Sequence, residues 1–197
     1  LTPAFRMRFW NTGAEGLVLV GMLAAVACII YWGPSLPNAL LLVLMFIASV
    51  GAGLIWGLIP AFFKANWNTN ETLFTLLMNY VATPLALFTC AIVDKSGHNT
   101  FPQIDTLFPG RVIYDIGGVR YLPIILCAVI VTVLMYFYLK KTKQGFELSV
   151  LGDSVNTARY VGINRKKVSY RTMAISGAIA GLVGFLLVCC QNGTLTS

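Results

Sequence analysis

The sequence is poor in charge, since only 11% of its 197 residues are Asp, Glu, Lys or Arg. Water-soluble domains carry about 25% charged residues, because their surfaces must be solvated. A chain of this length with so few charges lacks the surface of a soluble domain. The shortage therefore argues against every soluble globular class.

Catalytic and metal-binding groups are also scarce. The chain has one histidine, His98, and its polar neighbours favour an ordinary solvated role. We find no G-x-S-x-G, H-E-x-x-H or G-x-x-x-x-G-K-[ST] motif. The five cysteines include no C-x-x-C pair, and the adjacent Cys189 and Cys190 are a poor metal clamp. We therefore expect no enzyme activity, no nucleotide hydrolysis by this chain, and no metal or cofactor.

Apolar residues, by contrast, make up 57% of the sequence, and the mean hydropathy is +0.78. A helix needs about 20 mostly apolar residues to cross ~30 Å of hydrocarbon. Five stretches without Lys or Arg meet this need: 14–32, 38–62, 71–91, 121–139 and 172–190. We predict an all-α integral membrane protein with about five transmembrane helices.

Basic residues gather between these apolar runs, and the net charge is +7. The loop 140–171 holds most of the Lys and Arg residues, which predicts a cytoplasmic position for it. Five spans threaded from this loop bring Arg6, Arg8 and Lys64 to the same side. Such clustering is typical of a membrane surface, so we expect the lipid bilayer as a partner and no nucleic acid.

Two local patterns predict the starts of helices. Asn68-x-x-Glu71 before the third span and Thr12-x-x-Glu15 before the first have the spacing of capping boxes.

Two further patterns place glycines one helical turn apart, at Gly53-x-x-x-Gly57 and Gly177-x-x-x-Gly181. They indicate either close helix approach or only the general abundance of glycine in membrane helices.

Four polar residues lie in or beside the spans. Asn79 and Thr83 interrupt the third span, and Asn11 and Glu15 stand at the start of the first. Polar groups at membrane depth cost free energy unless they pair or line a cavity. A translocation pathway is one interpretation of these residues. The alternatives are an interhelical hydrogen bond for Asn79 and a helix cap for the residues of the first span.

The loop 140–171 has internal order. Residues 154–160 form a predicted short helix, with Asp153 capping its start and Gly162 ending it. A short helix on the membrane surface is suited to binding by a cytoplasmic partner protein. The alternative is a solvated basic loop that only fixes the topology.

The stretch GFELSVLGDSVNTARYVGI (145–163), followed by a basic turn and SGAIAGLVG (176–184), resembles the cytoplasmic coupling segment of bacterial ABC-transporter permeases. The subgroup comprises branched-chain amino acid, ribose and nucleoside importers. RFWNTGAEG (8–16) and NETLFTLLMNYVA (70–82) are similar to further motifs of its nucleoside or simple-sugar branch. Thr12 replaces the isoleucine usual there, and Leu17 replaces a glutamine, so a polar pathway contact is missing if that glutamine provides one.

The resemblance implies a single transmembrane permease domain over residues 1–197, expected to be the central portion of a longer multi-pass protein of the bacterial inner (plasma) membrane. It would form the path of a nucleoside or simple sugar. The alternative is a secondary transporter or channel not driven by ATP, which would need ion-coupling carboxylates or a repeated architecture.

The implied partners are a second permease subunit (as homodimer or heterodimer), separate ATP-binding cassette ATPase subunits, and an extracytoplasmic substrate-binding protein. The outer loop 92–120 is then a candidate docking surface, and residues 112–121 could form a small hairpin within it. The resemblance also implies coupling residues that receive the ATPase's movement: Gly145, Glu147, Gly152, Asp153, Asn156, Ala158, Arg159, Tyr160 and Gly162.

Overall fold

The computed structural model describes residues 2–33, 35–93 and 122–190, and all regular structure in these ranges is α-helical. Three short helices are α1 (Thr2–Arg6), α7 (Lys143–Asp153) and α8 (Val155–Tyr160). The long helices are α2 (Ala14–Trp32), α3 (Asn38–Trp67), α4 (Glu71–Val93), α6 (Leu122–Lys141) and α9 (Arg165–Cys190). All five long helices are apolar enough to cross a membrane, which confirms the predicted number of spans. The predicted hairpin at 112–121 lies outside the described residues.

Two spans extend beyond their predicted ends. Helix α3 continues to Trp67 rather than stopping at residue 62. Helix α9 begins at Arg165, within the basic loop, rather than at residue 172. The side-chain oxygen of Asn164 accepts a hydrogen bond from the backbone N–H of Lys167 at 3.3 Å and so caps this earlier start. Part of the predicted loop is therefore a helical continuation of the last span.

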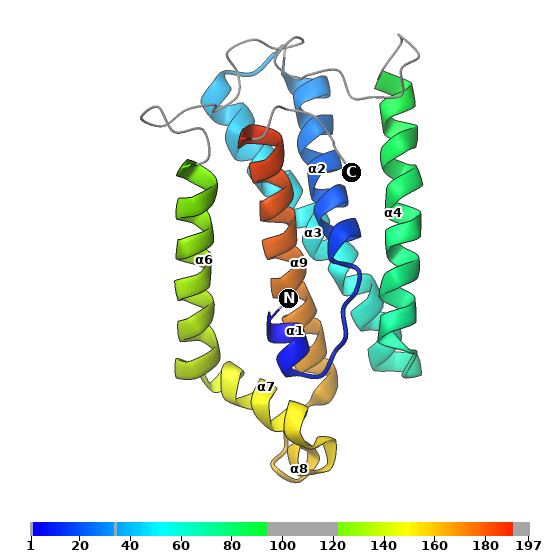
Figure 1. The fold of residues 1–197 in the computed structure, drawn as a ribbon, viewed down its shortest axis with the longest axis vertical. Coiled ribbons are helices and arrows are strands. Elements are labelled where there is room, and N and C mark those ends of the chain that lie inside the picture. Colours follow the sequence, from blue (N-terminus) through cyan, green and yellow to red (C-terminus); the bar gives the residue numbers. More distant parts are fainter. Residues whose placement is uncertain (1, 34, 94–121, 191–197) are drawn as a thin grey trace.

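Helices α2, α3 and α9 form the centre of the bundle (Figure 1). Gly53 and Gly57 of α3 face Gly177 and Gly181 of α9, and a Cβ added to Gly53 would lie 2.8 Å from the Cα of Gly181. A Cβ on Gly21 of α2 would meet the same Cα at 2.8 Å. Glycine lets three backbones meet here, as expected where lipid provides no hydrophobic drive for association. The two glycine patterns therefore mark real helix contacts.

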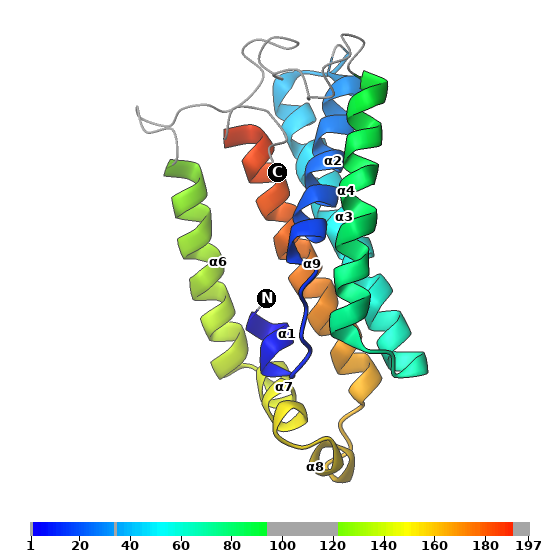
Figure 2. The ribbon, with the colours of Figure 1, turned by 45° about the vertical axis from the view of Figure 1, so that its right-hand side comes forward.

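The outer helices are attached less tightly. Helix α4 lies against α2, and α6 stands on the opposite side of the bundle (Figures 1 and 2). No residue of α6 is buried, and Ile125, Val129 and Leu134 are among its exposed apolar side chains. In the described part of the chain, α6 is anchored mainly by its continuation into α7.

Buried apolar side chains form two clusters. One fills the interior of the spans and includes Met22, Val26, Leu41, Met45 and Val188. The other joins α1 and α7 to the start of α9 and includes Met7, Phe9, Leu148, Leu151 and Met173. The second cluster gives the surface helices α1 and α7 their own packed interior.

The turn between α3 and α4 corrects one predicted cap. Asn68 has φ 50° and ends α3 in the left-handed conformation, instead of starting α4. The side-chain oxygen of Asn70 caps α4 by accepting hydrogen bonds from the backbone N–H groups of Thr72 (3.1 Å) and Leu73 (3.3 Å). The predicted capping box at Asn68 is therefore wrong by two residues.

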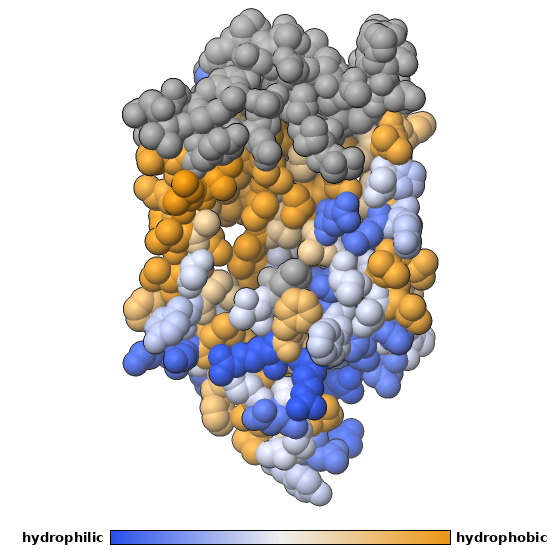
Figure 3. Space-filling model, in the orientation of Figure 1, coloured by the Kyte–Doolittle hydropathy of each residue, from blue (hydrophilic) through white to orange (hydrophobic). Residues whose placement is uncertain are grey.

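Hydrophilic residues gather at the end of the molecule that carries α7 and α8, below an apolar band (Figure 3). Arg6, Arg8 and Lys64 lie at this end together with the basic residues of the loop 140–171, as the alternation of the helices requires. Lys64 forms an ion pair of 2.5 Å with Glu71 across the α3–α4 turn. The positive-inside rule predicts that this end faces the cytoplasm.

Candidate functional site

The residues between α6 and α9 form two helices, where the sequence predicted one. We call residues 143–163 the coupling segment; they comprise α7, α8 and the turn that follows. The hydroxyl of Thr142 caps α7 by accepting a hydrogen bond from the backbone N–H of Gly145 at 3.1 Å. A Cβ on Gly145 would collide with the backbone carbonyls of Tyr138 and Leu139. Glycine thus permits the sharp corner from the α6 span into the surface helix α7.

Helix α7 is attached to the bundle along its inner side. Leu148 and Leu151 are buried there, and Gly152 packs against the backbone carbonyl of Arg6 in α1. Glu147 accepts a hydrogen bond from the Arg171 guanidinium, with Oε2 and Nη2 2.9 Å apart, and so links α7 to α9. This ion pair is partly buried, where screening by water is weaker than at an open surface.

Different residues define the start and the end of helix α8. The hydroxyl of Ser154, not the carboxylate of Asp153, caps its start by accepting a hydrogen bond from the Thr157 N–H at 3.3 Å. Asp153 is the last residue of α7, so the predicted cap was wrong by one residue. Gly162, with φ 78°, follows the helix in the left-handed region, in agreement with the predicted end.

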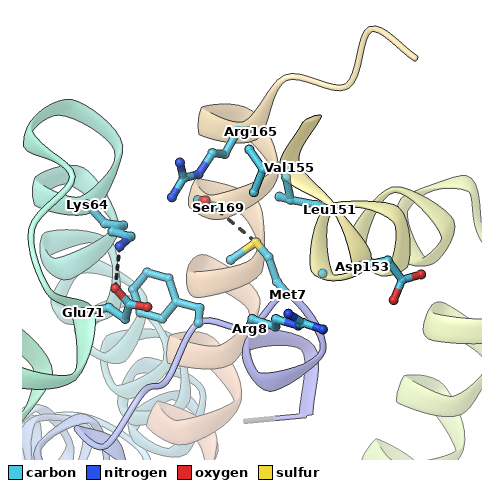
Figure 4. A pocket seen from close by; sticks show the side chains of 11 residues that line it. Met7, Arg8, Lys64, Glu71, Leu151, Asp153, Val155, Arg165 and Ser169 are labelled. Carbon is cyan, nitrogen blue, oxygen red and sulfur yellow. Dashed lines mark hydrogen bonds and ion pairs between the residues drawn. The ribbon is translucent and has the colours of Figure 1, made fainter. Parts of the chain in front are cut away.

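The coupling segment has an inner and an outer side. Ala158 is buried, and a 230 Å³ cavity on the inner side is lined by Leu151 and Val155 together with Met7 and residues of α3, α4 and α9 (Figure 4). The exposed residues of α7 and α8 include Asp153, Asn156, Arg159 and Tyr160. Asp153 also lines this cavity, and Asn156 and Arg159 line a second one between α8, α3 and α9, so the outer side is represented by Tyr160. Tyr160 is 92% exposed, so its ring is accessible to a partner protein.

A second group of residues joins the start of α2 to α4. We call Asn11, Thr12, Gly16, Thr75 and Asn79 the polar cluster. The amide oxygen of Asn79 accepts a hydrogen bond from the Gly16 N–H at 2.9 Å, and its amide N–H donates to the Thr12 carbonyl at 3.1 Å. The Thr12 N–H donates to the Thr75 hydroxyl at 3.2 Å. The third span thus holds the beginning of the first by side chains that pair with its backbone.

The four predicted pathway residues are not all brought together. Asn11 is 2% exposed, and its amide oxygen accepts a hydrogen bond from the Gly13 N–H at 2.9 Å. Thr83 is exposed and its hydroxyl donates to the Asn79 carbonyl of its own helix at 3.1 Å. Glu15 is exposed in the first turn of α2. Asn11 and Asn79 therefore belong to the polar cluster, whereas Thr83 and Glu15 stand outside it.

The predicted capping box at Thr12 is also wrong. Helix α2 starts after Gly13 without a side-chain cap, and the Thr12 hydroxyl instead approaches the Thr72 carbonyl at 3.1 Å. Sequence reasoning missed Thr75, which is 1% exposed. The sequence signal available for Thr75 was its spacing. It lies one helical turn before Asn79, on the helix face that continues to the buried Ala82.

We expect Asn79→Ala to lower the melting temperature of the purified protein by about 2–4 °C, because two interhelical hydrogen bonds at roughly 0.6 kcal/mol each are lost. Thr83→Ala is the matched control, since its hydroxyl bonds only within α4, and it should melt like the unchanged protein. A normal melting temperature for Asn79→Ala together with reduced transport would argue against a structural role and for a place on the pathway.

Among the described residues, no group of His, Cys, Asp or Glu is arranged to hold a metal ion.

Comparison with known proteins gives a consistent family. Residues 1–194 match the family model described as "Branched-chain amino acid transport system / permease component". The chain is 33% identical over 189 residues to the guanosine ABC transporter permease protein NupP of Bacillus subtilis, covering 92% of this chain and 52% of that protein. It is 31% identical over 195 residues to the glucose ABC transporter permease protein TsgB13 of Haloferax volcanii, covering 93% of this chain and 51% of that protein.

A third relative, the nucleoside ABC transporter permease protein NupB of Lactococcus lactis subsp. cremoris, is 26% identical over 190 residues, covering 92% of this chain and 52% of that protein. The chain spans about half the length of the curated relatives that it matches. No solved structure matches it.

Proposed function

Because the chain belongs to the family of branched-chain amino acid transport system permease components, we propose that it forms part of the membrane path of an ATP-driven importer in the plasma membrane. The observation that carries the proposal is the two-sided coupling segment. Its inner side is packed against α1 and α9, and its outer side offers Tyr160 to solvent. A mobile basic loop that only fixes topology would not need buried glycines at Gly145 and Gly152.

The motor in this proposal is a separate ATP-binding cassette ATPase that contacts the outer side of the coupling segment. These 197 residues contain no nucleotide-binding loop, in keeping with hydrolysis on a partner chain. ATP binding would move α7 and α8 as one body, and the Glu147–Arg171 ion pair would carry that movement to α9.

The complete transport unit would contain a second permease subunit and an extracytoplasmic binding protein. The outer loop 92–120, which lies almost wholly outside the described residues, remains our candidate for docking the binding protein. The substrate class that we propose is a nucleoside or simple sugar, because the relatives named above are described as guanosine, nucleoside and glucose permeases. Membership of this family favours an ATP-driven importer over the alternative of a secondary transporter.

Photo-crosslinking tests the assigned contact. We expect benzoylphenylalanine in place of Tyr160 to form a crosslink to the ATPase subunit when the whole protein and its ATPase are expressed together. Tyr136 of α6 is the matched control, since it is an exposed tyrosine outside the coupling segment, in the cytoplasmic half of its span. Crosslinking from position 136 but not from position 160 would contradict the proposed ATPase contact.

A further inference from the structure

A polar cavity of 560 Å³ lies where the end of α3, helix α8 and the start of α9 meet. We call it the basic pocket and define it by Asn66, Asn68, Arg159, Arg165 and Lys166, which are among its lining residues. Lys64 also borders it, but the charge of Lys64 is already paired with Glu71. No acidic residue lines the pocket in the described part of the chain.

Two of its cations are held in place by neutral groups. The Arg165 guanidinium donates to the side-chain oxygen of Asn68 at 3.4 Å, and the Lys166 ammonium donates to the side-chain oxygen of Asn66 at 3.1 Å. An amide oxygen orients a cation without cancelling its charge. The ion pairs of the described residues, Lys64–Glu71 and Glu147–Arg171, leave Arg159, Arg165 and Lys166 without an acidic partner. Three positive charges therefore surround one cavity uncompensated.

The start of α9 strengthens this positive potential. Helix α9 begins at Arg165, so the partial positive charge of its N-terminus lies beside the pocket. Figure 4 draws the neighbouring 230 Å³ cavity, which Arg165 also lines. The side-chain amides of Asn156 and Asn164 also line the cavity and could donate further hydrogen bonds. Several fixed donors around one positive cavity suit a tetrahedral oxyanion such as a phosphate group.

The pocket lies beside the end of α3, where a tryptophan is exposed. Trp67, at the end of α3, is 63% exposed. Its ring centroid lies 5.6 Å from that of Phe62 and 5.3 Å from that of Phe63. Tryptophan at the end of a membrane helix marks the headgroup level of the bilayer. Asn66 and Asn68, the residues that orient the two cations, flank this tryptophan in the sequence.

We propose that the basic pocket binds a phosphate group, and that its source is the headgroup of an anionic phospholipid in the cytoplasmic leaflet. Basic pockets between membrane helices on the cytoplasmic side are suited to such headgroups. The bound phosphate would bridge α3, α8 and α9, and so fasten the coupling segment to the two central spans. The proposal is independent of transport, because lipid binding needs neither ATPase nor substrate.

The test uses the whole protein, purified without its ATPase and placed in nanodiscs that contain phosphatidylglycerol and phosphatidylcholine. Phosphatidylglycerol retained by the protein is measured by native mass spectrometry. We expect the double variant Arg165→Ala/Lys166→Ala to lower the apparent affinity for phosphatidylglycerol by roughly tenfold or more, since two charge-assisted hydrogen bonds to the phosphate are lost. Phosphatidylcholine retention should not change.

Lys140→Ala/Lys141→Ala is the matched control. It removes the same charge from the same end of the molecule, but neither lysine lines the basic pocket. Equal losses in the two double variants would overturn the proposal, since they would indicate unspecific attraction by the basic surface. Arg165→Lys/Lys166→Arg keeps both charges and should retain phosphatidylglycerol, which separates loss of binding from loss of folding.

Inorganic phosphate distinguishes the two sources of the anion. We expect millimolar phosphate to leave bound phosphatidylglycerol in place, because the acyl chains add affinity for the lipid. Displacement of the lipid by millimolar phosphate, from both the unchanged protein and the Lys140→Ala/Lys141→Ala variant, would indicate a site for free phosphate and would contradict the lipid source. Retention that is insensitive to every substitution in the pocket would show that the pocket does not hold the lipid, and would overturn the proposal.

Discussion

Replacing Gly53 with alanine should greatly reduce the amount of folded protein. A Cβ at this position would meet the backbone of α9, 2.8 Å from both the nitrogen and the Cα of Gly181 and closer still to the carbonyl of Gly177. Backbone atoms cannot rotate away, so α3 and α9 would have to separate. Overpacking of this kind costs about 1–3 kcal/mol, and we expect a value near ~3 kcal/mol because all the obstructing atoms are backbone.

The measurement is the yield and melting temperature of the purified protein. For about 200 residues, a loss of ~3 kcal/mol corresponds to a fall of roughly 6–12 °C. Alanine is also the better helix former by about 1 kcal/mol, so a loss of helix propensity could not explain the fall. Gly51→Ala, two residues away in the same helix, is the control, since a Cβ there meets nothing within 4 Å. Equal melting of both variants would show that the α3–α9 contact does not depend on glycine.

This contact was the part of the packing that the sequence could predict. Glycines four residues apart lie on one helix face whatever the rest of the fold, and lipid selects for close packing of such faces. The five spans were predictable for a similar reason, because length and hydropathy alone satisfy the demands of the bilayer. Which glycine face meets which depends on the arrangement of the helices and was not predicted.

The helix ends show where local patterns become ambiguous. Asn68 and Asn70 both precede Glu71, and either side chain could cap the next helix. The left-handed backbone of Asn68 closes α3 and leaves the capping of α4 to Asn70. Asparagine suits both roles, so the sequence alone could not separate them.

Helix α7 was missed for a different reason. Its eleven residues are too short for a span, and two glycines, Gly145 and Gly152, argued for loop structure. In the fold both glycines are needed because other backbones pass close to them, at the end of α6 and in α1. The pairing of Asn79 with the Gly16 N–H likewise depends on contact between residues 63 positions apart.

These attachments make the coupling segment and the bundle one mechanical path. Helix α7 touches α6 at Gly145, α1 at Gly152 and α9 through Glu147 and Arg171. Helix α9 in turn meets α3 and α2 through its glycine face. A push on the outer side of α8 would therefore reach the central spans without passing through a flexible joint in the described chain.

Gly152→Ala tests that path, and we expect it to separate ATP hydrolysis from transport. The added Cβ would collide with the Arg6 carbonyl and displace α7 from α1. A cost of about 1–3 kcal/mol lowers the equilibrium constant for docking of the segment by roughly 5- to 160-fold. Uptake in liposomes that contain the whole protein, its ATPase and its binding protein should fall accordingly, while the ATPase continues to hydrolyse ATP.

Ser149→Ala is the control for this variant. Ser149 lies one turn earlier in α7, and its hydroxyl donates only to the Gly145 carbonyl of the same helix at 3.1 Å. It should transport normally, and both variants should be inserted in the membrane in equal amounts. Normal uptake by Gly152→Ala would refute the mechanical role of the α1–α7 contact. Loss of both uptake and ATP hydrolysis would place the defect in ATPase binding. A segment that only fails to transmit movement would leave ATP hydrolysis by the ATPase unchanged.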